Sequence, residues 1–119
     1  MKMQYFHIAR EVSLSSKMAK RMGACLVKGG KIISSGFNER KYSKLARFHD
    51  SKTRHAEISA LLGVPKDKSR GADVYVYREW KNGRIADSKP CPPCLVQLRL
   101  AGVDRVYHSI LDGFEGMKL

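Results

Sequence analysis

Two short stretches contain the residue types that could do chemistry. The segment His-Ala-Glu at residues 55–57 places an imidazole two positions from a carboxylate, and Pro-Cys-Pro-Pro-Cys at residues 90–94 places two thiols three positions apart. Histidine and cysteine are preferred ligands of Zn²⁺, which binds four ligands in a tetrahedron; a catalytic site takes three from protein and leaves the fourth position open. His55, Cys91 and Cys94 fulfil that count.

The spacing of the two cysteines suits the beginning of a helix. Residues 94–101 are predicted to be helical, with Gly102 closing the helix. Positions three apart share one helix face, so both sulfurs can reach one ion. The N-terminal end of a helix also favours thiolate over thiol, and proline is tolerated in its first turn. We therefore predict that Cys91 and Cys94 bind a metal from a helix start.

Glu57 is the candidate catalytic group beside the metal. Residues two apart in a regular helix are rotated by roughly 200°, so His55 and Glu57 converge only if His55 lies at the very start of the helix predicted up to Gly63. A carboxylate beside an activated water can carry its proton to a substrate nitrogen. Two alternatives stay open on the residues alone, a structural zinc site and a redox pair of cysteines. A redox pair leaves His55 and Glu57 without a role.

Hydrophobic periodicity and turn residues predict the elements that position these groups. In chain order they are an amphipathic helix over residues 4–22 ended by Gly23, a hairpin over residues 24–38 turning at Gly29-Gly30, a strand over residues 72–80, a type I′ turn at Asn82-Gly83 and a strand over residues 103–109. The charged residues 39–53 are predicted to form a loop, and residues 112–117 a turn-rich tail. Helices and strands in this order predict an α/β domain with helices packed on a sheet.

Composition favours a soluble protein with one core. A chain of 119 residues fits a single domain, predicted over residues 1–119. No apolar run approaches the roughly 18 residues that span a bilayer, and the first residues do not look like a signal peptide. We expect a cytoplasmic protein with no membrane partner. Cys25, among apolar neighbours, is expected to be an inert core thiol, and His7 and His108 lack partners in a motif.

The charge balance favours anionic partners. Lys and Arg outnumber Asp and Glu 23 to 11, which gives a net charge of +12. Such a surplus favours nucleotides or nucleic acids, although it could also serve solubility alone. The residues that could form a groove for single-stranded nucleic acid are cationic or aromatic: Lys41, Tyr42, Lys44, Arg47, Phe48 and Trp80. The aromatic ones could equally pack in the core or cover a small ligand. His49, in the same loop, could separately contact a substrate.

The combination His-x-Glu and Pro-Cys-x-x-Cys resembles the zinc-dependent cytidine and deoxycytidylate deaminase superfamily, and the likeness extends over most of the chain. The resemblance implies a three-layer α-β-α fold with a central mixed sheet. It implies that Zn²⁺ is held by His55, Cys91 and Cys94 and that Glu57 is the proton shuttle. It also implies substrate contacts, which are the Asn38 side chain, the backbone N–H of Ala56 and a carbonyl just before the cysteine pair, at Ser88 or Lys89.

Three departures from the family pattern bear on the substrate. Lys89 stands where many nucleotide and tRNA deaminases have glutamate and others have serine. The Asn82-Gly83 turn adds chain before Pro90. Pro92, Pro93 and Leu95 replace the residues that commonly fill this place in tRNA adenosine deaminases, which favours cytosine over adenine.

The expected function is zinc-dependent hydrolytic deamination of cytosine to uracil in a nucleoside or nucleotide. One alternative is a deaminase that acts on cytosine, or less favourably adenine, in single-stranded DNA or RNA. Another is a zinc-stabilised nucleic-acid binding module that does no chemistry. The resemblance also leads us to expect a homo-oligomer.

Overall fold

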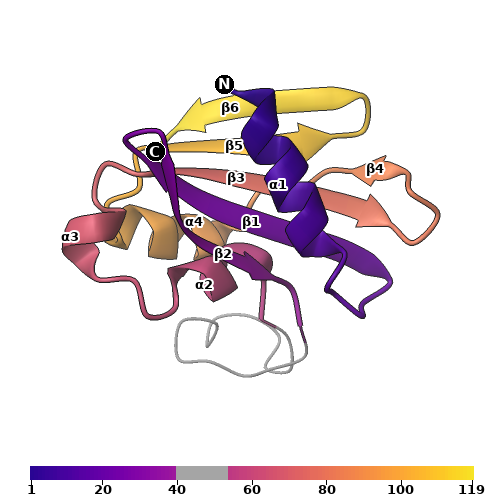
Figure 1. Cartoon of the computed structure of the whole chain (residues 1–119), viewed down its shortest axis with the longest axis horizontal. Coiled ribbons are helices and arrows are strands. Elements are labelled where there is room, and N and C mark those ends of the chain that lie inside the picture. The colour runs from indigo at the N-terminus through magenta and orange to yellow at the C-terminus, as the bar shows by residue number, and fades with distance from the viewer. Residues whose placement is uncertain (40–53) are drawn as a thin grey trace.

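A computed structural model describes residues 1–39 and 54–119. The elements, in chain order, are α1 (Met3–Ser13), β1 (Lys20–Lys28), β2 (Lys31–Phe37), α2 (Ala56–Leu61), α3 (Lys66–Ser69), β3 (Asp73–Trp80), β4 (Ile85–Ala86), α4 (Pro92–Leu100), β5 (Arg105–Ile110) and β6 (Gly113–Lys118) (Figure 1). The basic and aromatic residues predicted for a loop groove, Lys41, Tyr42, Lys44, Arg47 and Phe48, and the candidate substrate contact His49 lie outside the described residues. Within the described ranges, none of the helices has the length and hydropathy needed to cross a bilayer.

The strands form one mixed sheet in the order β2-β1-β3-β5-β6. β3 and β5 run parallel, the other neighbours run antiparallel, and β4 pairs only with the end of β3. One core cluster joins α1 to one face of the sheet, and another joins α2 and α4 to the opposite face (Figure 1). The predicted three-layer α-β-α fold with a central mixed sheet is confirmed.

Both predicted hairpins are present, but one turn differs in type. Gly29 and Gly30 have φ of 60° and 74°, the positive values that a tight two-glycine turn requires. In the β3–β4 hairpin, Gly83 has φ of 87°, whereas no described residue other than glycine has positive φ, so Asn82 does not adopt the conformation that a type I′ turn needs. The Trp80 and Arg84 backbones close a three-residue loop instead, with Trp80 N donating to Arg84 O at 2.9 Å.

The first helix is shorter than predicted. It ends at Ser13, and Met22 lies in β1, so the predicted helix over residues 4–22 is wrong in its second half. Of the apolar residues that extend the helical pattern, Met18 and Ala19 precede β1 and Met22 is a buried residue of this strand, so their spacing does not reflect one helix. Gly23 does not end a helix. A Cβ added to it would collide with the Ala9 carbonyl oxygen, so its lack of a side chain lets α1 lie directly on β1.

The last strand was missed in the sequence. β6 pairs antiparallel with β5 over its whole length, where a turn-rich tail was predicted. Its Phe114 ring lies 4.1 Å from the Phe6 ring of α1, centroid to centroid, so β6 completes the core under that helix. The short helix α3 was also not predicted. β6 forms a tight hairpin with the adjacent β5, so its hydrogen-bonding partner is local, while its Phe114 packs on a residue distant in sequence.

α2 packs unusually closely on β2. A Cβ at Gly36 would lie 2.5 Å from the Ala60 nitrogen and 2.7 Å from the Ser59 side chain. The Ser34 hydroxyl donates to the Ala60 carbonyl oxygen at 2.6 Å, which fixes the end of the helix to the strand. The sheet thereby determines where the beginning of α2 lies.

Candidate active site

His55, Cys91 and Cys94 meet where two helices begin. His55 is the N-cap of α2 and Cys91 the N-cap of α4, both with extended backbone. The His55 Nδ1 atom lies 3.7 Å from the Cys91 sulfur and 3.4 Å from the Cys94 sulfur, and the three ligand atoms all lie within 4.8 Å of one another. Tetrahedral zinc with ordinary Zn–N and Zn–S bonds separates its ligand atoms by roughly 3.6 Å. The three residues therefore fit a Zn²⁺ site.

The two thiols and the imidazole influence one another's proton affinity. The hydrogen bond to Cys91 and burial both raise the pKa of the Cys94 thiol. The hydrogen bond to Cys91 is also the main factor that raises the pKa of His55, against the opposing effect of burial. A bound divalent cation has the opposite effect and lowers the pKa of the thiols, because a coordinating thiol is deprotonated. The cluster is therefore chemically suited to exchange protons for a metal ion.

Glu57 follows His55 by two residues and is buried beside the site. Its side chain is only 1% exposed, and neither carboxylate oxygen has a hydrogen-bond partner among the described residues. Burial raises the pKa of Glu57, and the charges of His55 and Cys91 also act on it. An unpaired carboxylate is costly to bury unless a ligand or water uses it. The predicted helix start at His55 is confirmed, and it is what allows both side chains to lie at one site.

His55 opens on a cavity of about 340 Å³. Its walls come from the beginning of β1, the end of β2 and the end of β3: Met18, Ala19, Lys20, Met22, Asn38, His55, Arg78 and Trp80. A neighbouring hollow of about 380 Å³ is slightly larger, but it contains none of the predicted ligand or catalytic residues. The smaller cavity is the better candidate for substrate because one of the candidate metal ligands, His55, lines it.

Asn38 lines this cavity and also secures its wall. The side-chain oxygen accepts a hydrogen bond from Met22 N at 2.9 Å, and the side-chain nitrogen donates to Lys20 O at 2.9 Å. The Ser16 hydroxyl donates to the Asn38 carbonyl oxygen at 2.9 Å. One N–H of the Asn38 side-chain amide therefore remains for a substrate. Its predicted substrate contact stays a prediction.

The other predicted substrate contacts occupy different environments. Ala56 is the first residue of α2 and is fully buried, and its N–H lies in the turn where helical acceptors are lacking. The buried Ser88 hydroxyl donates to Val76 O at 2.8 Å and accepts from Ser109 N at 2.8 Å, so it ties the chain before Cys91 to the sheet. Lys89 is exposed. The side chains of Ser88 and Lys89 do not line the His55 cavity.

Arg78 is a cavity residue that the sequence analysis did not single out. It follows Val74 and Val76 at the two-residue period of β3, so it lies on the same face of the sheet as these buried valines. A charged residue in that register of a buried strand is the signal that could have identified it. Its positive charge favours the deprotonated form of both His55 and Glu57.

The fold and the ligand set define a zinc-dependent deaminase domain. Residues 1–110 match the family described as the cytidine and deoxycytidylate deaminase zinc-binding region, and the chain belongs to this family. The family, the enzyme class and the zinc cofactor predicted from the sequence are confirmed at this level.

Individual relatives agree with this assignment. The riboflavin biosynthesis protein RibD of Aquifex aeolicus (strain VF5) is 32% identical over 97 residues, which cover 76% of this chain and 21% of that protein. An uncharacterized deaminase in the luxG 3′ region of Aliivibrio fischeri is 29% identical over 118 residues, covering 87% of this chain and 69% of that protein. This chain thus spans about a fifth of the first relative and about two-thirds of the second.

Among solved structures, the dCMP deaminase of cyanophage S-TIM5 in complex with dCMP and dUMP is similar to this chain. The TM-score is 0.61 at 25% identity, with 89% of this chain and 81% of that chain covered. The apo form of the same enzyme gives a TM-score of 0.60 at 27% identity.

Proposed function

We propose that this chain catalyses hydrolytic deamination of cytosine to uracil in a nucleoside or nucleotide. The observation that supports this best is the Glu57 carboxylate, which is buried without a hydrogen-bond partner among the described residues and lies beside three residues that fit zinc. A structural zinc site needs no such carboxylate, whereas hydrolysis needs a proton carrier next to the reacting water. The similar cyanophage structure contains dCMP and dUMP, an amino-bearing pyrimidine nucleotide and its deaminated counterpart.

His55, Cys91 and Cys94 would hold the zinc ion, which when bound supplies a Lewis acid that makes water a better nucleophile near neutral pH. Glu57 takes a proton from the attacking water and returns it to the amino nitrogen of the substrate. Burial raises the pKa of Glu57, so the carboxyl holds that proton between the two transfers. One water is consumed, the bond between the ring carbon and the exocyclic amino nitrogen breaks, a carbonyl forms at that carbon and ammonia leaves.

The substrate contacts are proposed around this centre. The unused N–H of Asn38 would bind the sugar or base, the Ala56 N–H would bind the pyrimidine edge, and a backbone carbonyl at Ser88 or Lys89 would bind the opposite side of that edge. The cavity volume of about 340 Å³ falls in the range of small-ligand sites. The predicted single domain, cytoplasmic location and homo-oligomer stay predictions.

The test is a Glu57→Gln variant assayed for uracil formation. The substrates are cytidine, deoxycytidine, their 5′-monophosphates and a cytosine-containing single strand. We expect turnover to fall by roughly 10²–10⁴, the range for loss of a general acid–base group, while metal analysis shows unchanged zinc content. Glu11→Gln is the matched control, because Glu11 is an exposed carboxylate on α1.

Near-normal turnover by Glu57→Gln would refute the proton-carrier role. Uracil formation from none of these substrates by the unmodified protein would contradict the proposed reaction and favour the non-catalytic zinc module.

A further inference from the structure

Two cross-strand pairs continue the zinc-bearing face of the sheet beyond the buried core. In the antiparallel register of β1 and β3, Met22 lies opposite Arg78 and Lys20 lies opposite Trp80. Side chains two apart share a face, so Arg78 and Trp80 follow Val76 on the side of the sheet that α2 and α4 cover. Where the helical cover ends, this face becomes a wall of the His55 cavity.

Arg78 is a half-buried cation, and some N–H donors of its guanidinium are not used by the described residues. Its Nε atom is buried and has no hydrogen-bond partner among the described residues. One terminal nitrogen donates to the Asp87 carbonyl oxygen at 3.3 Å, and no described carboxylate forms an ion pair with Arg78. A buried Nε–H without a hydrogen-bond partner is unfavourable, so the position of Arg78 on a cavity wall suits it to bind an anion.

Lys20 adds a second cation to the same cavity. Its Nζ atom lies 4.5 Å from the centroid of the Trp80 ring, which holds the ammonium by a cation–π contact instead of an ion pair. The opposite face of the same strands differs, because there Arg10 and Arg21 both contact the buried Glu79 carboxylate, at 3.1 and 3.5 Å. The cavity thus contains cations to which the described protein supplies no acidic partner.

We propose that Arg78 and Lys20 form the subsite for the 5′-phosphate of a cytosine mononucleotide. The inference rests on the proposed deaminase function and specifies its substrate class. A guanidinium binds phosphate oxygens through two parallel, charge-assisted hydrogen bonds, and an ammonium adds a mobile point charge. His55, Asn38, Arg78 and Lys20 all line this one cavity, so a nucleotide bound with its base at His55 would have both cations within the same cavity.

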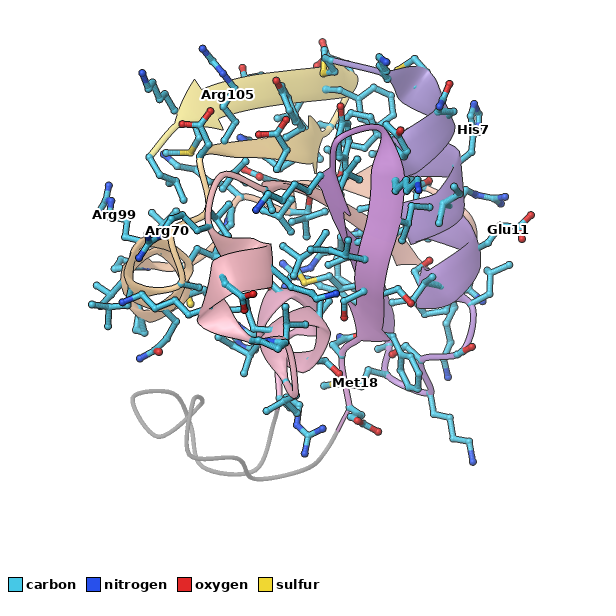
Figure 2. All side chains as sticks on the ribbon, turned by 60° about the vertical axis from the view of Figure 1, so that its left-hand side comes forward. His7, Glu11, Met18, Arg70, Arg99 and Arg105 are labelled. Atoms are coloured by element: carbon cyan, nitrogen blue, oxygen red, sulfur yellow. The ribbon has the colours of Figure 1, made fainter. Side chains whose placement is uncertain are left out.

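The position of these two cations favours a mononucleotide over a polymer. Arg78 is half-buried in the wall of a cavity of about 340 Å³, whereas a polynucleotide backbone would track exposed cations along a surface. The exposed cations of the β3–β4 hairpin, Lys81 and Arg84, do not line the cavity. Other cations lie elsewhere on the molecule, and Figure 2 shows Arg70 and Arg99 on a flank away from Met18, which lines the cavity.

The test compares phosphorylated with unphosphorylated substrates in an Arg78→Ala variant. Hydrogen bonds to charged groups contribute about 1.5–3 kcal/mol, which corresponds to a loss of roughly 10- to 100-fold. We expect this loss in kcat/KM for CMP and dCMP, mainly through KM, with less than about 3-fold change for cytidine and deoxycytidine. Lys20→Ala should give a smaller loss with the same selectivity.

Arg84→Ala is the matched control. It removes the same charge from the same hairpin at a residue outside the cavity, so it should leave both substrate classes unchanged. Arg78→Lys is the second variant in case Arg78→Ala does not fold. It keeps the charge but loses the planar fork, so we expect an intermediate loss for the monophosphates only.

A binding measurement separates this inference from the proposed reaction. Calorimetric titration of the Glu57→Gln variant with dUMP and with deoxyuridine, each with and without Arg78→Ala, requires no turnover. Weaker binding of dUMP alone supports the subsite even if the unmodified protein deaminates none of the substrates offered. An equal loss for nucleosides and monophosphates, or a loss confined to the cytosine-containing single strand, would overturn it.

Discussion

Replacing Gly36 by alanine is expected to displace α2, the helix that has His55 as its N-cap and carries Glu57. The added Cβ would lie 2.5 Å from the Ala60 nitrogen and 2.7 Å from both Ser59 carbons that it meets, against an ordinary contact of about 3.5 Å. All these atoms belong to α2, so the helix must move away from β2 by about 1 Å. Overpacking costs about 1–3 kcal/mol, and a rigid helix backbone places Gly36→Ala near 3 kcal/mol. The melting temperature should fall by roughly 10 °C.

The same displacement should disturb the metal site. His55 and Glu57 move with α2, while Cys91 and Cys94 stay on α4, so the 3.4 and 3.7 Å separations between imidazole nitrogen and sulfurs change. A misplacement of about 1 Å is enough to reduce turnover by roughly 100-fold. We therefore expect Gly36→Ala to lose zinc to a chelator more readily and to lose kcat.

The assay is thermal unfolding combined with chelator competition and uracil formation. Gly113→Ala is the control, because a Cβ at Gly113 meets nothing within 4 Å and its backbone does not have positive φ. That variant should stay within about 0.5 kcal/mol of the unmodified protein. If Gly36→Ala matched Gly113→Ala in stability, zinc retention and turnover, the reasoning that β2 positions the site would be wrong.

Three further outcomes are expected. Burial raises the pKa of Cys25 to about 12, and the hydrogen bond to Cys91 together with burial raises the pKa of Cys94, so after zinc removal an alkylating reagent at pH 8 should modify the less buried Cys91 and spare Cys25 and Cys94 until the chain unfolds; modification of Cys25 in the folded protein would contradict this. Ser88→Ala removes a fully buried hydroxyl that bonds two backbone groups and should cost about 1–3 kcal/mol in urea unfolding, whereas an unchanged midpoint would show that these bonds contribute little. Glu79→Gln should lower the free energy of unfolding less than the Arg10→Met, Arg21→Met double variant. We expect the double variant to lose about 3 kcal/mol or more, because it leaves a buried carboxylate uncompensated. The reverse order in denaturant unfolding would refute this.

The metal site could be predicted because its geometry is local. His55 and the two cysteines lie at helix starts, and glycine, proline and spacing mark those starts in the sequence. The convergence of the two helices depends on the sheet, but the need for four zinc ligands supplies the missing constraint. Residue types and spacing therefore indicated the candidate ligands and the family resemblance implied their roles, while their distances came only from the structure.

The remaining errors have different causes. β6 is a strand because it forms a hairpin with the adjacent β5 and because its Phe114 packs on the distant Phe6, whereas the turn residues at 112–113 led us to interpret this segment as a tail. Ser88 was interpreted through its place beside the cysteines, yet its hydroxyl is occupied by Val76 and Ser109. Arg78 was overlooked because the two-residue period that places it on the face of Val74 and Val76 was not followed to the end of the strand.

The β3–β4 hairpin and the segment that follows it, which the buried pair Ser88 and Ser109 fixes, have separate roles. β4 pairs only with the end of β3, and the chain is fixed again by hydrogen bonds between Ser88 and Ser109 before it reaches Cys91. The hairpin can therefore change in length or composition while the ligand distances stay the same. Grafting hairpins of other lengths between Arg78 and Ser88 is a route to altered substrate range that leaves the catalytic centre intact.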